Sequence, residues 1–121
     1  MAKIMIVISD KTIADFLGKV MTAYGHEPTI VTNSKDAITE ANSLNPNLIL
    51  LDFMMPDLSG FELCRVLRAN QNLVQTPIIM ISGDERIESR DNAFKAGVND
   101  YVTVPFDFDD LKSRLNALIV G

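Results

Sequence analysis

The stretch Leu48-Ile49-Leu50-Leu51 is apolar at every position and leads directly into Asp52. The runs Ile4–Ile8 and Ile78–Ile81 are also apolar at every position. Strands that alternate apolar and polar residues bury one face, whereas strands that are apolar throughout bury both faces. Strands of the second kind are typical of a parallel sheet that helices cover on both sides. We therefore predict that these three runs form the centre of such a sheet.

Two further short runs, and the segments between all five runs, predict the rest of the fold. Pro28–Val31 and Tyr101–Val104 are the other strand candidates. The intervening segments carry apolar residues at helical spacing, and we expect helices at the following places: Ile13–Tyr24, Ala37–Leu44 after a cap at Asn33 or Ser34, Phe61–Leu67, Ile87–Phe94, and Leu111–Ile119 after a cap at Asp107. Strands and helices then alternate along the chain, and right-handed crossovers turn this order into a doubly wound α/β fold.

The length and composition favour one domain of an ordinary globular type. A chain of 121 residues matches a single domain at roughly 100–200 residues per domain, and we expect residues 1–121 to form it. The net charge of −5 and the lack of a basic run argue against direct binding of nucleic acid. One cysteine and one histidine leave neither an internal disulfide nor a Cys/His metal site. No apolar stretch reaches the roughly 18 residues of a membrane span, and no signal peptide precedes the first run, so we predict a cytoplasmic protein with no membrane segment.

Polar residues directly follow several of the predicted strands. Asp10 comes after the first strand, Asp52 after the third and Ser82 after the fourth. The carboxyl ends of parallel strands lie at one edge of a sheet, where the active sites of doubly wound folds are found. Two carboxylates at this edge repel each other unless a cation or a proton lies between them. Mg²⁺ suits such oxygen ligands, because it needs only one or two carboxylates and keeps several waters.

Other interpretations of the same residues remain open at this point. Asp10 could serve only as the N-cap of the first helix, Ser82 could simply cap the end of its strand, and Tyr101 could be a static, half-buried aromatic. A small-molecule enzyme is a weaker alternative, because residues 9–13 contain no glycine. This argues against a dinucleotide-binding loop or a P-loop.

The segment from Leu50 to Gly60 reads Leu-Leu-Asp-Phe-Met-Met-Pro-Asp-Leu-Ser-Gly. It resembles the phosphoacceptor loop Asp-x-x-Met-Pro-x-x-x-Gly of response-regulator receiver domains in bacterial two-component signalling. Ile4–Ile8, Pro77–Gly83 and Ala96–Tyr101 resemble further motifs of that family, in the same order and spacing. The resemblance covers the whole chain. It implies a flavodoxin-like receiver fold with a five-stranded parallel sheet in the order 2-1-3-4-5.

The resemblance also implies a role for each matching residue. Asp52 would accept a phosphoryl group as a carboxylate nucleophile, and Asp10, Asp52 and the backbone carbonyl of Met54 would bind Mg²⁺. Ser82 would be the switch hydroxyl that moves to the phosphoryl group, and Tyr101 the coupled aromatic that turns inward with it. The domain would catalyse at most its own phosphorylation and dephosphorylation. Its partners would be a histidine kinase or a phosphotransfer protein, a downstream protein or an attached output domain, and a second copy in a homodimer.

Two positions depart from the family pattern. Ser9 stands where a second acidic residue is usual, and its hydroxyl would reach Mg²⁺ through a water. Val104 stands where a lysine is usual before Pro105, so no ammonium would reach Asp52 or a phosphoryl oxygen. We therefore expect phosphorylation that is weakly coupled to the switch, together with a cis Val104–Pro105 bond. The same departures support an alternative function, a degenerate pseudo-receiver that binds a protein partner independently of phosphorylation.

Overall fold

The sheet has the predicted order and direction. A computed structural model describes residues 2–84 and 86–119, and its five strands are all parallel, in the order β2-β1-β3-β4-β5. The elements in chain order are β1 (Lys3–Val7), α1 (Lys11–Ala23), β2 (Glu27–Val31), α2 (Ser34–Leu44), β3 (Leu48–Asp52), α3 (Gly60–Ala69), a 3₁₀ turn η1 (Gln71–Leu73), β4 (Ile78–Ser82), α4 (Ile87–Ala96), β5 (Asp100–Thr103) and α5 (Phe108–Leu118). The predicted strands are confirmed to within one residue at either end, and Val104 lies just beyond β5.

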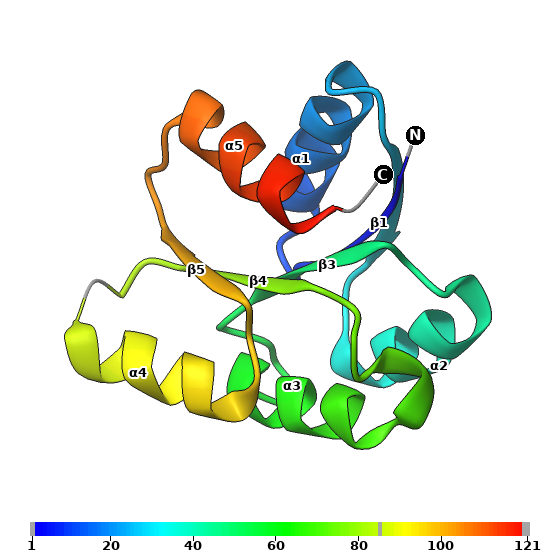
Figure 1. The fold of residues 1–121 in the computed structure, drawn as a ribbon, viewed down its shortest axis with the longest axis vertical. Coiled ribbons are helices and arrows are strands. Elements are labelled where there is room, and N and C mark those ends of the chain that lie inside the picture. The colour runs from blue at the N-terminus through cyan, green and yellow to red at the C-terminus, as the bar shows by residue number, and fades with distance from the viewer. Residues whose placement is uncertain (1, 85, 120–121) are drawn as a thin grey trace.

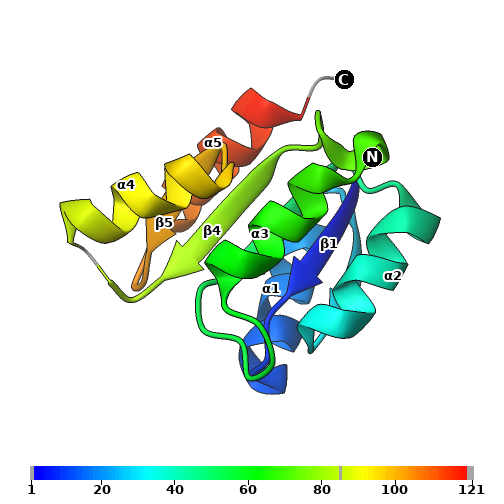
Figure 2. The same ribbon diagram turned by 90° about the horizontal axis from the view of Figure 1, so that it is seen from below.

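Helices cover both faces of the sheet, as the fully apolar strands require. Helices α1 and α5 lie on one face and α2, α3 and α4 on the other (Figure 1), and Figure 2 shows the latter three seen from below. Along β3, Leu48 and Leu50 pack beneath α1 and α5, while Ile49 and Leu51 pack beneath the opposite helices. All four side chains are fully buried. Successive residues of a strand point to opposite faces, so a strand covered on both sides has no place for a polar residue until it ends.

Short polar side chains and left-handed residues set the helix ends. Asn33, rather than Ser34, caps α2 by accepting a hydrogen bond from the Asp36 amide at 2.8 Å. Asp107 caps α5 as predicted, accepting from the amides of the two residues that follow Phe108. Helix α4 ends at Gly97, whose φ of 116° is in the left-handed region that favours glycine. Within residues 2–84 and 86–119, no helix has the length and apolar character needed to cross a membrane.

A single arginine joins three segments at the amino-terminal edge of the sheet. The Arg68 guanidinium donates to the carbonyl oxygens of Leu73 at 2.8 Å and Thr76 at 2.6 Å, just before β4. It also donates to the carbonyl oxygen of Gly97 at 2.9 Å and to Oδ1 of Asn99 at 2.7 Å, just before β5. Burial lowers the pKa of Arg68, and its acceptors, which also include the Val74 carbonyl oxygen at 3.4 Å, are all neutral oxygens. Arg68 therefore fixes the carboxyl end of α4 to the loop in front of β4, a contact that the sequence interpretation did not anticipate.

Candidate functional site

Asp52 is the last residue of β3 and lies at the carboxyl edge of the sheet. Its Oδ1 accepts a hydrogen bond from the Met54 amide at 3.1 Å, which holds the partly buried carboxylate in one orientation. Burial raises the pKa of Asp52, the Met54 amide lowers it, and the charge of Asp10 raises it again. Asp52 ends β3 and Asp10 follows the neighbouring strand β1, so the chain brings both carboxylates to the same edge of the sheet.

Asp10 caps α1 with only one of its two carboxylate oxygens. Its Oδ1 accepts from the amides of Thr12 at 2.9 Å and Ile13 at 3.2 Å, so the interpretation as an N-cap is confirmed. Both of these bonds use the same oxygen, and a carboxylate offers lone pairs on two. The N-cap and the ligand interpretations are therefore compatible, because capping leaves Oδ2 for a cation.

Ser9 lies against the carbonyl group that was predicted as a metal ligand. Its hydroxyl donates to the Met54 carbonyl oxygen at 3.3 Å. The oxygen-bearing groups brought together are thus two carboxylates, one backbone carbonyl and one hydroxyl. This hard, oxygen-only set fits Mg²⁺, which completes its coordination with waters. In the described ranges, no three or more His, Cys, Asp or Glu side chains gather in a way that would hold a metal, so the fit is to a cation that needs few protein ligands.

The loop after β3 is held in place by Gly60 and Asp57. A Cβ on Gly60 would lie 2.7 Å from the Asp52 carbonyl oxygen, closer than real Cβ atoms come, so only glycine allows this approach. On the other side of the loop, the Asp57 carboxylate accepts from the amides of Ser34 at 3.1 Å and Lys35 at 3.2 Å. These hydrogen bonds at the start of α2 lower the pKa of Asp57 to about 2. Asp57 was missed in the sequence interpretation because its partners are backbone amides more than twenty residues away.

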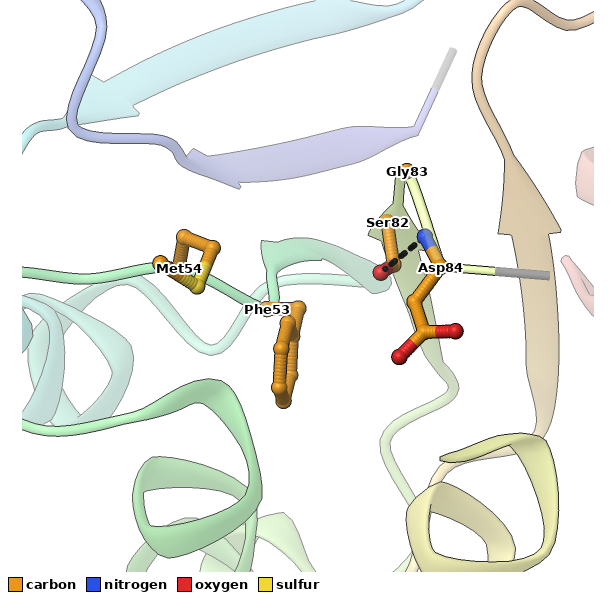
Figure 3. Close-up of a pocket in the computed structure, with 5 residues that line it drawn as sticks. All are labelled: Phe53, Met54, Ser82, Gly83 and Asp84. Atoms are coloured by element: carbon orange, nitrogen blue, oxygen red, sulfur yellow. Dashed lines mark hydrogen bonds between the residues drawn. The ribbon is translucent and has the colours of Figure 1, made fainter. Parts of the chain in front are cut away.

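Ser82 and Tyr101 meet at the backbone of Asp84. The Ser82 hydroxyl accepts from the Asp84 amide at 3.0 Å, as Figure 3 shows, and the Tyr101 hydroxyl donates to the Asp84 carbonyl oxygen at 2.7 Å. Tyr101 is only 2% exposed, so the interpretation as a half-buried aromatic is wrong: the ring is buried because its hydroxyl finds a partner inside. The two predicted switch residues are therefore linked through one residue of the β4–α4 loop.

An open pocket of about 520 Å³ lies between the β3 and β4 loops, lined by Phe53, Met54, Ser82, Gly83 and Asp84 (Figure 3). The Asp84 carboxylate pairs with the Arg86 guanidinium, with Nη2 to Oδ2 at 2.7 Å. It also accepts from the Ser89 hydroxyl at 2.6 Å. The Arg86 and Ser89 hydrogen bonds hold the pKa of Asp84 well below its usual range. One wall of the pocket is thus formed by a carboxylate that is already paired with a guanidinium.

Val104 directly follows β5, beside the end of β4 at the carboxyl edge of the sheet. Its amide donates to the Ser82 carbonyl oxygen at 2.9 Å, its side chain is 40% exposed, and the bond to Pro105 is cis, as predicted. The side chain before Pro105 is thus apolar and brings no charge to the end of β5.

Comparisons with known proteins place these features in a family. A family model described as "Response regulator receiver domain" matches residues 4–116. The DNA-binding response regulator MtrA of Mycolicibacterium smegmatis is 31% identical over 115 residues, which cover 95% of this chain and 49% of that protein. The chain spans about half the length of the first curated relatives it matches.

Solved structures share the fold over almost the whole chain. The Francisella response regulator 1452 receiver domain has a TM-score of 0.91 and 34% identity, covering 98% of this chain and 97% of that chain. The receiver domain of the sensor histidine kinase PA1611 from Pseudomonas aeruginosa has a TM-score of 0.90 and 27% identity, with 98% and 97% coverage. The latter is described with a magnesium ion coordinated in its active site cleft.

Proposed function

The chain belongs to the response-regulator receiver domain family of two-component signalling, and on this premise we propose that Asp52 is its phosphoacceptor. The observation that carries the proposal is the position of Asp52: its carboxylate ends β3, is oriented by the Met54 amide and interacts with Asp10. The phosphorylation-independent alternative is not favoured, because the relatives are response regulators.

The proposed reaction is the transfer of one phosphoryl group to a carboxylate oxygen of Asp52. The oxygen that does not bond the Met54 amide attacks phosphorus, and an O–P bond forms. When the donor is a phosphohistidine, the P–N bond breaks, its electron pair stays on the imidazole nitrogen, and solvent supplies the proton that this nitrogen needs. The Met54 amide holds the other oxygen of Asp52, which orients the nucleophile for the attack. The domain would then catalyse no more than its own phosphorylation and dephosphorylation.

Asp10, Asp52 and the Met54 carbonyl are the groups that would hold Mg²⁺, with Ser9 acting through a water. The ion would neutralise negative charge on the transferring phosphoryl group. Ser9 already bonds the Met54 carbonyl, so its hydroxyl would also fix the direction of that ligand. Because one acidic residue is replaced by Ser9, we expect weaker metal binding than two adjacent carboxylates would give.

Phosphorylation would act on the rest of the domain through Asp84. If the Ser82 hydroxyl turns toward a phosphoryl oxygen, the Asp84 amide loses its acceptor, while Tyr101 still bonds the Asp84 carbonyl. The unpaired Asp84 amide would favour a new conformation of the β4–α4 loop, and this change would reach the surface formed by α4, β5 and α5. The absence of a lysine at Val104 would make this coupling weak.

Response regulators act with histidine kinases and output domains, and we assign this chain the receiver part of such a system. We propose that residues 1–121 are one receiver domain in the cytoplasm, phosphorylated by a histidine kinase or a phosphotransfer protein. Its output would be a downstream protein, an attached output domain or a homodimer. The length of its relatives supports an attached output domain, because the chain spans about half of them.

Incubation with Mg²⁺ and acetyl phosphate, followed by intact-mass measurement, tests the proposal. We expect a shift of one phosphoryl group that disappears in Asp52→Asn and persists in Asp57→Asn, the matched change on the same loop. No shift, or a shift that survives Asp52→Asn, would show that Asp52 is not the phosphoacceptor.

A further inference from the structure

A phosphoryl group on Asp52 would enter an environment of negative charge. Asp10 interacts with Asp52 electrostatically, and the carboxylate of Asp84 lines the adjoining pocket. Val104 offers only methyl groups at the end of β5. A phosphoryl dianion is stabilised chiefly by cations and charge-assisted hydrogen bonds. Beyond the charge that Mg²⁺ would supply, a phosphoryl oxygen facing Val104 would lack a charge-assisted partner, and a second cation near the pocket would stabilise it.

Arg86 is a cation brought to the edge of this pocket by its partner. Its guanidinium bonds both oxygens of Asp84, with Nε to Oδ1 at 3.0 Å, Nε to Oδ2 at 3.1 Å and Nη2 to Oδ2 at 2.7 Å. The Arg86 amide also donates to Asp84 Oδ1 at 3.0 Å. Arg86 thus lies two residues after Asp84 in the chain and directly precedes the first residue of α4.

The ion pair is of a kind that can be exchanged. The Arg86 side chain is 74% exposed and that of Asp84 is 19% exposed, so water competes for the guanidinium and the pair contributes little to folding. A phosphoryl group carries more charge than a carboxylate and presents several acceptor oxygens to a guanidinium. Asp84 keeps the Ser89 hydroxyl and the Arg86 amide as donors when the guanidinium leaves.

We propose that Arg86 exchanges partners on phosphorylation. Its guanidinium leaves the Asp84 carboxylate and pairs with the phosphoryl group on Asp52. This inference rests on the proposed function of Asp52. The exchange makes Arg86 a positioning residue in the resting domain and the cation of the phosphorylated site. Because Arg86 immediately precedes α4, its movement connects the phosphoryl group to the first turn of that helix without a lysine on β5.

Beryllofluoride with Mg²⁺ serves as a stable probe for the phosphoryl group, and its affinity is measured by ¹⁹F NMR titration. We expect Arg86→Gln to weaken the affinity by about 3- to 10-fold, a range set by an exposed, charge-assisted contact. Arg86→Lys should recover part of the loss, since it keeps the charge but not the planar fork. Arg65→Gln removes the same charge from an exposed position on α3 and should leave the affinity unchanged.

Asp84→Asn distinguishes exchange from a purely structural role of the pair. Exchange predicts tighter binding of the probe, because the competing carboxylate is gone, whereas a structural latch predicts weaker binding for both single variants. Removing a negative charge near the site would tighten binding by itself, so the double variant is needed. The gain from Asp84→Asn should be larger with Arg86 present than in the Arg86→Gln background.

The outcomes separate the two proposals. An unaltered chain that takes neither beryllofluoride nor a phosphoryl group overturns the function of Asp52, and the exchange with it. A chain that binds the probe at Asp52 but shows equal affinities for Arg86→Gln and Arg65→Gln overturns the exchange alone. An equal gain from Asp84→Asn in both backgrounds overturns it as well.

Discussion

The two ends of α4 are held by arginines of opposite character. At its carboxyl end, Arg68 donates to backbone carbonyls and one amide oxygen from three separate segments. At its amino end, Arg86, whose side chain is 74% exposed, bonds a single carboxylate, that of Asp84. The first arrangement satisfies several partly buried neutral oxygens from separate segments with one donor group, so losing it would leave them all unpaired at once. The second loses little when a stronger anion takes the guanidinium. We propose that α4 is fixed at one end and adjustable at the other, the end next to the pocket that adjoins Asp52, the proposed phosphoacceptor.

Removing the guanidinium at the fixed end should give the largest effect. Arg68→Met keeps the stem that packs beside Gly97 but leaves the carbonyls of Leu73, Thr76 and Gly97 without their donor. We expect the free energy of unfolding to fall by about 3 kcal/mol, on the scale of buried bonds to charged groups. Urea denaturation followed by circular dichroism measures this change. Arg65→Met, on the exposed face of α3, serves as control, and a loss no larger than that of the control would contradict the assignment of Arg68.

A methyl group at Gly97 should weaken the same end by a smaller amount. Its φ of 116° is unfavourable for alanine, and a Cβ there would lie 2.8 Å from Arg68 Cγ. We expect Gly97→Ala to cost about 1–2 kcal/mol of unfolding free energy. Gly25→Ala is the matched control, because Gly25 has a φ of 89° with nothing within 4 Å. Equal losses for the two variants would mean that backbone conformation alone, without the contact to Arg68, accounts for the effect.

Acid should distinguish the two ends, because only one of them depends on a carboxylate. The pKa of Asp84 is held below its usual 3.8 by Arg86 and Ser89. Its contribution to stability is therefore complete above that value and disappears as the pH falls toward the lower pKa of the folded state. We expect the difference in unfolding free energy between the unaltered chain and Asp84→Asn to shrink below about pH 4. The deficit of Arg68→Met should stay constant over the same range, and a deficit that also shrank would indicate an acidic partner of Arg68.

Sequence reasoning reached the parts of this comparison that have a local pattern. The run from Leu48 to Leu51 predicts a strand buried on both faces, and the residues directly after the strands predict the site, because parallel topology brings those ends together. Arg68 was not predictable in this way, since its acceptors are backbone carbonyls that every sequence carries. Asp57 was not predictable either, since its partners are backbone amides, which nearly every residue carries. The capping box of Ser59 and Glu62, in contrast, has a recognisable spacing that the sequence interpretation passed over.

A lysine at position 104 should reduce the contribution of Arg86 to the affinity for beryllofluoride. Val104→Lys would supply a second cation at the end of β5, so Arg86→Gln should weaken beryllofluoride binding less in that background than in the unaltered chain. We expect the remaining loss to be about twofold or less, in line with a screened surface contact. The comparison uses the same ¹⁹F titration on all four combinations of the two changes. If Arg86→Gln weakened binding by the same factor with Val104 and with Lys at that position, the two cations would not serve the same phosphoryl group.

The most direct test of a helix fixed at one end is the pattern of amide chemical-shift changes when beryllofluoride and Mg²⁺ are added to the unaltered chain. The account predicts that the largest changes lie at Asp84, Arg86 and Ser89, through the exchange of partners rather than through the weakly coupled Ser82, and that changes at Gly97 and Asn99 are near zero. The side-chain Nε signal of Arg86 should move with the first group and that of Arg68 should not. Changes of similar size at both ends of α4, or an Arg86 signal that stays where it is, would contradict the account.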